Sequence, residues 1–391
     1  MLPGQGYHGT GTKEVVAQVD VPKGSLPKKI MLATYYHERS DIRVGNLPDP
    51  TILSDTDAIV RVTLAGICGA DFDFINNGPE MGVPQGMRMG HEFVGIVEAV
   101  GKAVHTVKVG DRVVASAMFV DGVCHHCKRD LPSACEHGGL FGSPLFVQHG
   151  GSDIQGGQSE FVRVPYANGT LFKLPDSFTS GSEDHKALPL ADNFATGYHG
   201  ALNSNILPGE TVVVIGDGAV GQSAVMAAAK LFNPEQVIHV GRYDSRLEFS
   251  KQKSGATHTV NGKTQDPIEY VKSLTNGYGA MSIIDTVGNK GSISQAMAMA
   301  HAGGKLSVLG FGHLYEPVDA PYSDALFRNL TIHTGVVNVA AYMRTLLPIV
   351  ENGQIDPSVI FTDTLPLAEA KQGYDLMMGR SAGTVKVALK P

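Results

Sequence analysis

The sequence predicts an α/β protein with two domains, one rich in β-strands and one built around a doubly wound parallel sheet. Three observations carry this prediction. The chain has 391 residues, which exceeds the roughly 100–200 residues of a typical single domain. Residues from about 30 to 185 are rich in Gly, Pro and short β-branched runs, which is typical of a barrel-like β domain. From about residue 190, apolar strands alternate with helical segments, which is typical of a parallel sheet.

The first region supplies short strands that are separated by turn residues. From about residue 333 the composition returns to that of the first region. We therefore predict an N-terminal extension at 1–29, a β-rich domain from 30–190 and 333–391, and an inserted domain at 191–332. The strands expected in the first region are Asp57 to Thr63, Phe93 to Val100 and Asp111 to Ala115.

The inserted domain is predicted from its alternation of strands and helices. The apolar run from Thr211 to Ile215 is expected for a strand that is buried on both faces of a parallel sheet. Gly255 is expected to end the helix that precedes it. The expected elements are strand Thr211 to Ile215, helix Gln222 to Leu231, strand Gln236 to Val240, helix Ser245 to Ser254, strand Met281 to Val287, helix Ser292 to His301 and strand Lys305 to Leu309.

Composition and charge narrow the range of partners. The chain is 42% apolar and 18% charged, so it can bury substantial cores. Its net charge is −7 and it has no basic cluster, so neither nucleic acid nor an anionic membrane surface is expected as a partner. No apolar run reaches the roughly 20 residues that span a bilayer.

The first 28 residues do not resemble a targeting signal. They contain no apolar core and no arginine, and they carry Glu14 and Asp20, which argues against a secretory signal and against a transit peptide. The cysteines are spaced for metal binding rather than for disulfide pairing. Both observations predict a cytoplasmic protein.

A glycine-rich loop lies between the first strand and the first helix of the inserted domain. It reads Gly216-Asp-Gly218-Ala219-Val220-Gly221, which in this context is typical of a dinucleotide-binding loop. Gly216 allows the tight turn, Gly218 lets the backbone approach a pyrophosphate, and Gly221 permits close packing of helix on strand. Ala219 and Val220 would offer N–H groups at the helix N-terminus. The alternative is a glycine-rich turn without a ligand.

The end of the next strand indicates which dinucleotide is bound. NAD-binding proteins normally carry a carboxylate there, but this chain has Gly241 followed by Arg242 and Tyr243. The Arg242 guanidinium suits a 2′-phosphate, and Arg246 lies one turn further on. We therefore predict NADP(H) in preference to NAD(H). The alternative is a solvated arginine and a relaxed choice of cofactor, in which NAD(H) is also used.

Each of the four cysteines lies in a pattern of metal ligands. Cys68 precedes Gly90-His91-Glu92, which adds an imidazole and a carboxylate to the thiolate. Three protein ligands and one open position form a catalytic zinc site, and Asp192 is a candidate third ligand. Alone, His91 is more often a core histidine and Asp192 a helix cap, so the combination carries the prediction. The second lobe consists of Asp121, Cys124, Cys127 and Cys135.

With these motifs in view, the chain resembles the zinc-containing medium-chain alcohol dehydrogenase family over nearly all of residues 30–391. The resemblance implies a GroES-like catalytic domain, a Rossmann cofactor domain and a homodimer or homotetramer. The motifs, in family order, are Cys68-x-x-Asp71, Gly90-His91-Glu92, the cysteine lobe, Asp192-x-x-x-Thr196-Gly197-Tyr198 and the glycine loop.

The resemblance also implies roles for single residues. Cys68, His91 and Asp192 would bind the catalytic zinc, with Glu92 as an alternate or adjacent ligand and Asp71 orienting His91. An aspartate as third ligand resembles the branch of NADP-dependent secondary alcohol dehydrogenases, in agreement with the Arg242 argument. The residues implied to contact the nicotinamide end of the cofactor are Thr196, Val287, Leu309, Gly310 and Phe311.

The second lobe departs from the family pattern, in which four cysteines hold a structural zinc. Asp121 stands in the first place, before Cys124, Cys127 and Cys135. A carboxylate oxygen can complete a tetrahedral site, so we expect a structural zinc held by these four residues. The alternatives are a lobe that has lost its metal, or a ligand supplied by one of the histidines of this loop: His125, His126 or His137.

Another departure concerns the proton that must leave the substrate alcohol. The family normally has Ser or Thr two residues after the zinc cysteine, and this chain has Ala70, which has no hydroxyl. Asp73 acting through a water is one hypothesis for the relay. The substrate pocket is expected to be apolar, with walls formed by Ala70, Phe119, Phe141, Val336 and Val337.

The predicted function is reversible hydride transfer between NADP(H) and a medium-sized alcohol, ketone or aldehyde, with zinc as a Lewis acid. Alternatives of the same fold are a polyol, sugar or formaldehyde dehydrogenase and a dismutase that retains its cofactor. A non-catalytic relative is a further alternative, suggested by Ala70. A zinc hydrolase is disfavoured because it needs no dinucleotide loop.

Overall fold

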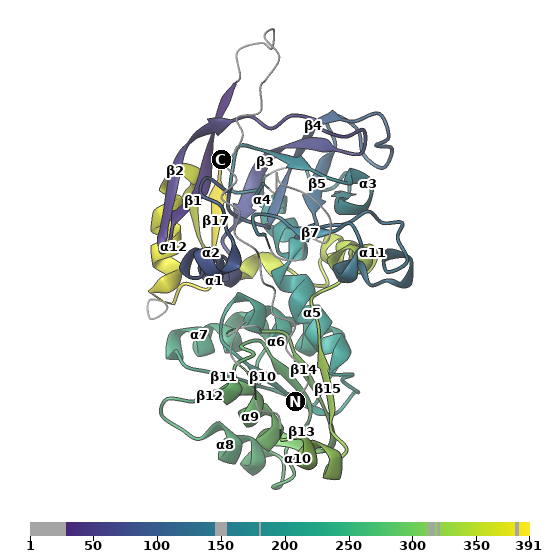
Figure 1. Cartoon of the computed structure of the whole chain (residues 1–391). Helices are drawn as coiled ribbons and strands as arrows, with labels where there is room; N and C mark the ends of the chain where they lie inside the picture. The colour runs from purple at the N-terminus through teal and green to yellow at the C-terminus, as the bar shows by residue number, and fades with distance from the viewer. Residues whose placement is uncertain are drawn as a thin grey trace, which may run out of the picture.

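The computed structural model describes residues 29–144, 155–179, 181–310, 312, 317–318, 321–379 and 383–391. Figure 1 shows two domains, one above the other, with α5 (Asn193–Asn203) at their border. The upper domain combines the purple and blue first part of the chain with the yellow C-terminal elements, and the lower domain is teal to green. The predicted fold class, a GroES-like domain with a Rossmann-type domain, is confirmed.

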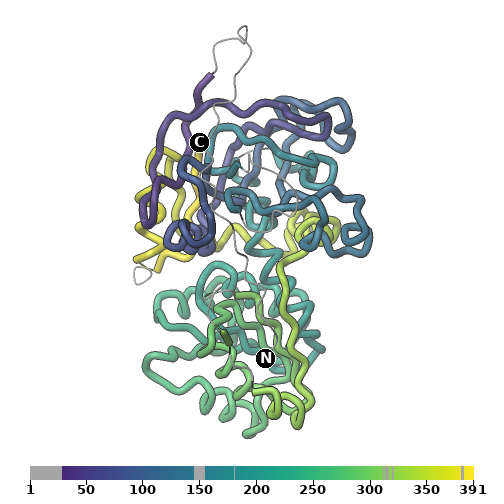
Figure 2. The backbone as a smooth tube through the Cα atoms, viewed as in Figure 1, coloured from purple at the N-terminus to yellow at the C-terminus, as the bar shows by residue number. Residues whose placement is uncertain are grey.

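The upper domain contains a mixed sheet in the order β16-β17-β3-β4-β5-β9, and β8 also pairs with β3. The C-terminal strand is antiparallel to β3, with Leu389 opposite Ala65, so segments from both ends of the chain lie side by side (Figure 2). The strands of this sheet are β3 (Ala58–Gly66), β4 (Phe93–Val100), β5 (Arg112–Ala115), β8 (Phe161–Val164), β9 (Leu171–Lys173), β16 (Phe361–Pro366) and β17 (Lys386–Lys390).

Shorter elements complete the upper domain. An antiparallel hairpin flanks the sheet, and a two-stranded pair lies beside the cysteine lobe. These elements are β1 (Ile30–Glu38), β2 (Asp41–Pro48), α1 (Gly69–Asn76), α2 (Gly78–Met81), β6 (Met118–Phe119), η1 (Cys127–Arg129), η2 (Pro132–Ala134), β7 (Gly139–Leu140), α3 (Ala167–Thr170), α4 (Gly181–Ala187), η3 (Leu188–Ala191), η5 (Pro357–Ile360), η6 (Leu367–Glu369) and α12 (Ala370–Met378).

The lower domain contains a parallel sheet in the order β12-β11-β10-β13-β14-β15. The chain runs from β10 to β11 and β12 on one side and then crosses back to β13 on the other side of β10, which creates the crevice where α/β proteins bind nucleotides. Residues 331–334 pair with β14, so this segment belongs to the parallel sheet. The strands are β10 (Thr211–Ile215), β11 (Gln236–Gly241), β12 (His258–Asn261), β13 (Ala280–Asp285), β14 (Ala300–Val308) and β15 (Thr331–Thr334).

The helices of the lower domain follow the expected alternation. The predicted helix from Ser245 to Ser254 consists of α7 (Asp244–Phe249) and a π-helical turn, η4 (Ser250–Ser254). Gly255 ends it with a φ of 103°, a left-handed conformation that favours glycine. The other helices are α6 (Ala219–Leu231), α8 (Pro267–Leu274), α9 (Lys290–Met299) and α10 (Tyr322–Phe327), whereas α11 (Val339–Glu351) lies in the upper domain (Figure 1).

One hydrophobic cluster joins the two domains. It contains Val114 of β5, Phe194 of α5, Ala224 of α6 and Leu346 of α11. The Phe194 side chain is fully buried, and burial of such a side chain contributes about 1.5–3 kcal/mol. This shared core fixes α5, and therefore the residues at its start, between the catalytic sheet and the cofactor sheet.

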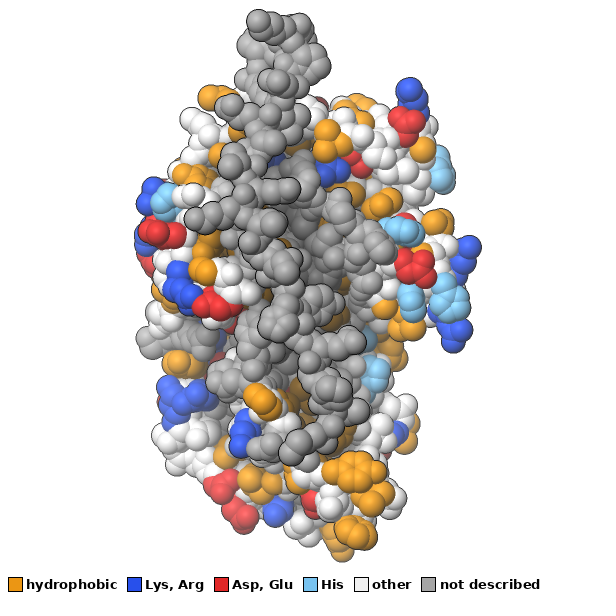
Figure 3. All heavy atoms as spheres, viewed as in Figure 1, with side chains coloured by type: hydrophobic (Ala, Val, Ile, Leu, Met, Phe, Trp, Pro, Cys, Tyr) orange, Lys and Arg blue, Asp and Glu red, His pale blue; other side chains and the backbone are white. Residues whose placement is uncertain are grey.

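No helix in the described part of the chain is both long and apolar enough to cross a bilayer. On the face shown in Figure 3, hydrophobic side chains gather at the lower end of the molecule, in the region of α10. Tyr322 and Phe327 of α10 are 75% and 83% exposed.

Candidate metal and cofactor site

Four side chains from three separate parts of the sequence meet where the domains join. The ligand atoms of Cys68, His91, Glu92 and Asp192 all lie within 4.8 Å of one another. The Oδ2 atom of Asp192 is 3.4 Å from Sγ of Cys68 and 3.3 Å from Nε2 of His91. The structure therefore brings together the thiol, imidazole and carboxylates that the sequence singled out.

Local backbone geometry explains how these side chains converge. Cys68 follows β3 and occupies the N-cap position of α1. Gly90 has a φ of 92°, and a Cβ there would lie 2.4 Å from Cγ of Gln158, so only glycine fits before His91. A Cβ at Gly66 would lie 2.3 Å from Oε2 of Glu92. These two glycines make room for the residues of the cluster.

Asp71 supports the cluster through its contacts with His91 and Cys68. Its Oδ1 atom lies 3.5 Å from Nδ1 of His91, as expected for a carboxylate that orients a metal-binding imidazole. Its Oδ2 atom accepts hydrogen bonds from the Cys68 N–H at 3.0 Å, from Gln158 Nε2 at 3.1 Å and from the Tyr374 hydroxyl at 3.2 Å. One fully buried carboxylate thus fixes both the helix start at Cys68 and the His91 ring.

Glu92 forms a buried ion pair with Lys386 of β17. The distance between Lys386 Nζ and Glu92 Oε1 is 2.6 Å, and both side chains are fully buried. Burial favours the neutral amine, but Glu92 and Cys68 outweigh it and raise the pKa of Lys386. The other carboxylate oxygen of Glu92, Oε2, has no hydrogen-bond partner among the described residues. A cation beside this oxygen would satisfy it.

The protonation equilibria of the cluster also favour a cation. Burial raises the pKa of Cys68 to about 11. Burial opposes charge on Asp192 too, but the hydrogen bond and charge of His91 outweigh it and lower the pKa of this carboxyl. Desolvation of His91 is similarly outweighed by Cys68 and Asp192, so its pKa is raised well above the usual value. A divalent metal ion would displace these shared protons, and the sulfur, nitrogen and oxygen donors fit zinc.

Asp192 is held in place by its neighbours on α5. Thr196 Oγ1 donates a hydrogen bond to Asp192 Oδ1 at 2.7 Å, and Asn193 Nδ2 donates to Oδ2 at 3.2 Å. Asp192 occupies the N-cap position of α5, but its side chain makes no capping hydrogen bond. The Asp192 carboxylate therefore does not cap the helix, which was the alternative role considered for it. Thr196, expected to contact nicotinamide, orients the third ligand in this structure.

The residues considered for the proton relay and the pocket lie in different surroundings. Asp73 is half-buried in α1, two residues after Asp71, and side chains two apart on a helix do not share a face. Its relay role stays a prediction. The expected pocket walls Phe119 and Phe141 are instead packed in the core: Phe141 is 1% exposed, and its ring meets those of Phe93 and Phe119 edge-on at 5.1 and 5.5 Å.

The second lobe forms another cluster of ligand atoms. Those of Asp121, Cys124, Cys127 and Cys135 also lie within 4.8 Å of one another. Asp121 Oδ1 accepts the N–H groups of Val123 and Cys124 at 2.8 and 2.9 Å. Burial raises the pKa of the Cys127 thiol above its usual range. A zinc ion would hold such thiols as thiolates, so this donor set also fits zinc.

A histidine completes the surroundings of the lobe. His137 Nδ1 lies 2.6 Å from Asp121 Oδ2. Burial opposes ionisation of Asp121, but hydrogen bonds from the Cys124 N–H and from His137 outweigh it and lower the pKa of this carboxyl. In this structure His137 orients the aspartate rather than replacing it.

The glycine loop has the geometry expected of a dinucleotide-binding turn. Gly216 has a φ of 105°, and a Cβ at Gly221 would lie 1.7 Å from the Gly216 carbonyl oxygen, so both positions require glycine. Gly218 is the N-cap of α6, and a Cβ there would meet nothing within 4 Å. Gly218 therefore faces open space at the N-terminus of the helix that begins with Ala219 and Val220, where an anion is stabilised.

The end of β11 carries a carboxylate after all, supplied by the glycine loop. Asp217 Oδ2 accepts the N–H groups of Arg242 and Tyr243 at 2.6 and 3.0 Å. A Cβ at Gly241 would lie 2.7 Å from this oxygen, so Gly241 is needed to admit Asp217. Position 241 itself carries no carboxylate, as the sequence shows, but Asp217, which the sequence analysis did not single out, brings one to this strand end.

Three cations surround the end of β11. The Arg242 side chain is exposed. Arg246 is 5% exposed; its guanidinium donates to the Thr384 carbonyl and lies 3.7 Å from Asp217 Oδ1, so in this structure it is engaged with protein groups. Lys263, in the loop after β12, places Nζ 4.1 Å from the centre of the Tyr243 ring.

The remaining predicted cofactor residues lie at the carboxyl ends of β13 and β14. The N–H groups of Leu309 and Gly310 both donate to the Asp285 carbonyl, at 2.8 and 3.3 Å. A Cβ at Gly310 would lie 2.2 Å from the carbonyl carbon of Val287, so Gly310 and Val287 are in close contact. Phe311 lies outside the described residues.

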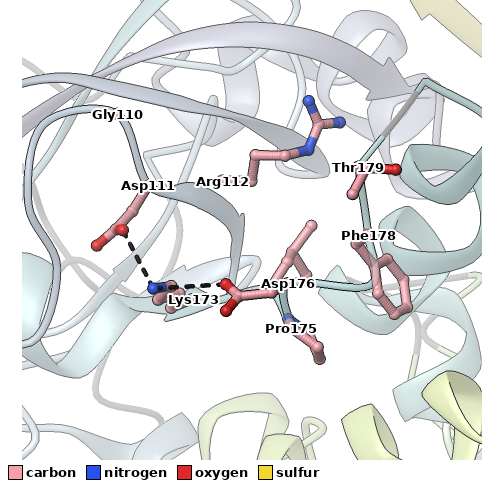
Figure 4. Close-up of a pocket in the computed structure, with 9 residues that line it drawn as sticks. Gly110, Asp111, Arg112, Lys173, Pro175, Asp176, Phe178 and Thr179 are labelled. Atoms are coloured by element: carbon pink, nitrogen blue, oxygen red, sulfur yellow. Dashed lines mark ion pairs between the residues drawn. The ribbon is translucent and has the colours of Figure 1, made fainter.

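A separate surface pocket of about 290 Å³ lies away from these clusters, near the start of β5 and the end of β9. Figure 4 shows Lys173 between Asp111 and Asp176, with ion-pair distances of 3.4 and 3.8 Å. Arg112 pairs with Asp184. The cations of this pocket are thus neutralised by carboxylates, and it offers no site for an anionic cofactor.

The comparisons with known proteins agree with this geometry. A model of the alcohol dehydrogenase GroES-like domain matches residues 54–176, and a zinc-binding dehydrogenase model matches residues 219–352. The chain belongs to the zinc-containing medium-chain alcohol dehydrogenase family. The oxidoreductase assignment of the sequence analysis is thereby confirmed at the level of a zinc-type alcohol dehydrogenase that acts on a small molecule.

Several dehydrogenases resemble this one along nearly their whole length. The uncharacterized zinc-type alcohol dehydrogenase-like protein AdhB of Bacillus subtilis is 34% identical, over 92% of this chain and 100% of AdhB. The alcohol dehydrogenase TADH of Thermus sp. ATN1 is 32% identical, with a TM-score of 0.84 over 92% of this chain and 99% of that structure. A zinc-binding dehydrogenase of Sinorhizobium meliloti, solved bound to NADP, is 26% identical with a TM-score of 0.79, covering 93% and 100%.

The structure adds residues to the alcohol dehydrogenase site that the sequence did not single out. Lys386 interrupts an apolar run from Val385 to Leu389, and a lone charge in such a run was a usable signal. Lys263 and Arg242 follow the ends of neighbouring strands, because Gly241 of β11 pairs with Asn261 of β12. Nothing in the sequence pattern indicated that Gln158 and Tyr374 would contact Asp71 at this site.

Proposed function

We propose that this alcohol dehydrogenase is zinc-dependent, prefers NADP(H), and interconverts a medium-sized alcohol with its ketone or aldehyde. The observation that carries the proposal is the convergence of Cys68, His91 and Asp192 on one point between the domains. A glycine loop with an open helix N-terminus lies in the second domain. A metal and a dinucleotide can thus act on one substrate.

The chain's own residues would hold the metal as follows. Cys68, His91 and Asp192 are the proposed zinc ligands. Asp71 orients His91, and Thr196 orients Asp192. Glu92 is paired with Lys386 but keeps one oxygen toward the cluster, so it is proposed as an alternate ligand. A zinc ion bound here would supply Lewis acidity toward the substrate oxygen.

Several features support a small substrate beside these ligands. A Cβ at Gly69 would meet nothing within 4 Å, so there is space next to Cys68. Ala70 has no hydroxyl, so the alcohol proton must leave through water or another group, with Asp73 as the proposed candidate. The nicotinamide carries the hydride, and the protein's part is to orient it through the ends of β13 and β14.

The preference for NADP(H) is supported by the cations at the end of β11. Arg242 is exposed there, and Lys263 adds a second exposed cation across the Tyr243 ring. Asp217 brings one negative charge, but its Oδ2 is occupied by two backbone N–H groups and Arg246 lies beside Oδ1. A 2′-phosphate would therefore meet Arg242 and Lys263. The NADP-bound Sinorhizobium meliloti relative agrees with this proposal.

A structural zinc in the second lobe is also proposed, with Asp121, Cys124, Cys127 and Cys135 as ligands. The lobe packs on α11: the side-chain oxygen of Asn338 accepts from the N–H and hydroxyl of Ser133, at 3.2 and 2.8 Å. A metal that fixes the lobe would therefore also fix the segment leading into α11. The four cysteines form no disulfide, which supports a reducing, cytoplasmic location.

A homodimer formed through the cofactor sheet is proposed as well. Strand β15 is the edge of the parallel sheet among the described residues, and Ile332 in it is 41% exposed. Next to it, Tyr322 and Phe327 of α10 are exposed. An unprotected edge beside apolar side chains favours pairing with a second copy. Light scattering of the wild type and of Phe327→Glu tests this: a monomeric wild type would exclude it.

The function is tested with the zinc-loaded protein and a panel of alcohols, ketones and aldehydes. Each substrate is assayed with NADP(H) and with NAD(H) at equal concentration, alongside metal analysis. We expect turnover that is faster with NADP(H) and is lost after removal of zinc. Turnover that prefers NADH would overturn the cofactor proposal alone, whereas no turnover with any substrate would favour the non-catalytic alternative.

A further inference from the structure

We infer that His239 is a positioning residue of the dinucleotide site, which holds the first peptide group of the glycine loop in its binding orientation. This inference rests on the proposed use of a dinucleotide, but not on the choice between NADP(H) and NAD(H). It concerns a buried, titratable side chain of β11 that has no part in the metal cluster. The argument depends on two hydrogen bonds of the imidazole and on the direction of one peptide group.

The His239 ring joins the glycine loop to the π-helical turn. Its Nε2 atom lies 2.8 Å from the carbonyl oxygen of Gly216, and its Nδ1 atom lies 2.7 Å from the hydroxyl of Ser250. Both His239 and Ser250 are completely buried. The ring therefore spans the distance between the loop that precedes α6 and the segment that follows α7.

These contacts fix which nitrogen carries the proton. A carbonyl oxygen can only accept, so Nε2 must donate to Gly216. Burial lowers the pKa of His239, so the ring is neutral and Nδ1 accepts from Ser250. The Gly216 carbonyl thus selects the tautomer, and the Ser250 hydroxyl donates to the other ring nitrogen and holds the imidazole in this orientation. Replacing Ser250 would leave Nδ1 without its donor and would free the ring to rotate.

The held carbonyl determines what the loop presents to a ligand. The Gly216 oxygen points toward α6 and the buried His239 ring. A Cβ on Gly221 would lie only 1.7 Å from this oxygen, and His239 Nε2 lies 2.8 Å from it. In a planar trans peptide the next N–H, that of Asp217, points the opposite way, toward the open side of the loop. His239 therefore keeps a partial negative charge away from a bound pyrophosphate and directs an N–H toward it.

Backbone hydrogen bonds of the π-helical turn fix the position of Ser250. The Ser250 carbonyl accepts the N–H groups of Gly255 at 2.9 Å and of Ala256 at 3.2 Å. From the same turn, the Ser254 hydroxyl donates to the side-chain oxygen of Gln222 at 2.7 Å. The Gln222 amide in turn donates to the Arg246 carbonyl at 2.9 Å. The π-helical turn thus supports both the loop, through His239, and the first helix after it, through Gln222.

The test compares two amides that reach different distances. In His239→Gln the side-chain amide can extend to the place of Nε2 and still donate to the Gly216 carbonyl. In His239→Asn the amide reaches only the place of Nδ1, so the Gly216 carbonyl loses its donor. His258→Asn, a half-buried histidine in the neighbouring strand β12, is the matched control.

Binding is measured on the full-length, zinc-loaded protein by fluorescence titration with NADPH, NADH and adenosine 2′-monophosphate. We expect His239→Asn to raise the Kd for both dinucleotides about tenfold or more, and His239→Gln to stay within about threefold of the wild type. The Kd for adenosine 2′-monophosphate, which lacks a pyrophosphate, should not change in either variant. Thermal unfolding of each variant is recorded in parallel.

The outcomes separate this inference from the proposed function. Equal dinucleotide affinity in His239→Asn and the wild type would overturn the inference, as would equal losses in the Asn and Gln variants that follow their loss of thermal stability. If His239→Asn does not fold, Ser250→Ala replaces it, and an unchanged Kd there would overturn the inference. A wild type that binds neither dinucleotide would instead overturn the proposed function.

Discussion

Lys386 Nζ lies 2.6 Å from Glu92 Oε1, and neither side chain is exposed to solvent. Glu92 follows a proposed zinc ligand directly, and Lys386 comes from the last strand of the chain. The C-terminal strand thus contributes a charge to the metal cluster from nearly three hundred residues away. Without Lys386, the cluster would contain an uncompensated buried carboxylate.

Replacing Lys386 should therefore destabilise the protein. Lys386→Met leaves Glu92 buried without a partner, and we expect a loss of about 3–5 kcal/mol in the free energy of unfolding. Lys386→Arg keeps the charge and should retain most of the stability. Urea denaturation of the zinc-loaded variants measures the difference. A loss below about 1 kcal/mol in Lys386→Met would show that the pair is not needed.

Removing the charge of Asp71 should weaken zinc binding at the catalytic cluster. Asp71→Asn cannot hold the His91 ring as a carboxylate does, and we expect zinc affinity to fall about 10–100-fold. Competition with a chromogenic chelator measures this change. Asp55→Asn, in an exposed loop of the same domain, serves as the control. Equal zinc affinity in both variants would rule out the orienting role of Asp71.

Arg242 should distinguish the two cofactors. Arg242→Ala is expected to raise the KM for NADPH about 10–100-fold, since charged hydrogen bonds to the phosphate are lost, while the KM for NADH changes less than about threefold. Lys263→Ala should act in the same direction with a smaller effect. Arg61→Ala, an exposed arginine of β3, controls for loss of charge. Equal effects on NADPH and NADH would contradict the proposed phosphate contact.

The second lobe should bind one zinc ion of its own. Elemental analysis is expected to find about two zinc ions per chain in the wild type and about one in Asp121→Ala. His125→Gln, in the same loop, should keep both ions. A thermal unfolding scan should show a lower Tm for Asp121→Ala, because the lobe no longer holds its contact with α11. A finding of about one zinc ion per wild-type chain would exclude the proposed structural zinc site.

Stability should depend on pH through His199. This histidine of α5 is 3% exposed, and burial, followed by repulsion from His333, lowers its pKa to about 4. From pH 6.5 down to about 4 the unfolded chain binds a proton at this imidazole and the folded chain does not. The free energy of unfolding should therefore fall as pH is lowered through this window, by up to about 3 kcal/mol.

Denaturation of His199→Gln between pH 4 and 8 checks this dependence. The variant has no group that titrates at this position, so its stability should fall less steeply from pH 6.5 to pH 4 than that of the wild type. The neutral state of His199 also explains its contacts, which are a Tyr342 hydroxyl at 2.6 Å from Nδ1 and Asn203 Nδ2 at 2.9 Å from Nε2. Parallel pH profiles for variant and wild type would exclude His199 as the cause.

Local sequence patterns were sufficient where the chemistry is local. The strand at Phe93–Val100 and the strand at Thr211–Ile215 have the predicted bounds, because β-branched runs between turn residues leave few alternatives. Gly255 ends its helix as expected, because only glycine readily adopts a left-handed φ. The two sets of proposed metal ligands could be grouped from residue type and motif order, since each set would have to supply thiolates, imidazoles or carboxylates to one ion.

Contacts between distant strands could not be read in the same way. Asp217 approaches the end of β11 only because parallel strands place their carboxyl ends at one edge of the sheet. The same packing places Lys263 against Tyr243, and it buries Phe119 and Phe141 in the catalytic core where the sequence suggested a pocket wall. Residue type alone does not state which strands are neighbours.

The sequence by itself predicted the family and the two-domain plan and singled out the proposed donor residues, because these depend on residue types and on the order of short motifs along the chain. Tertiary structure alone decided that Lys386 neutralises Glu92, that Thr196 holds Asp192 and that His239 holds the glycine loop. Each of these contacts pairs polar groups that burial deprives of water. Such pairing is set by the path of the whole backbone, and no short stretch of sequence contains it.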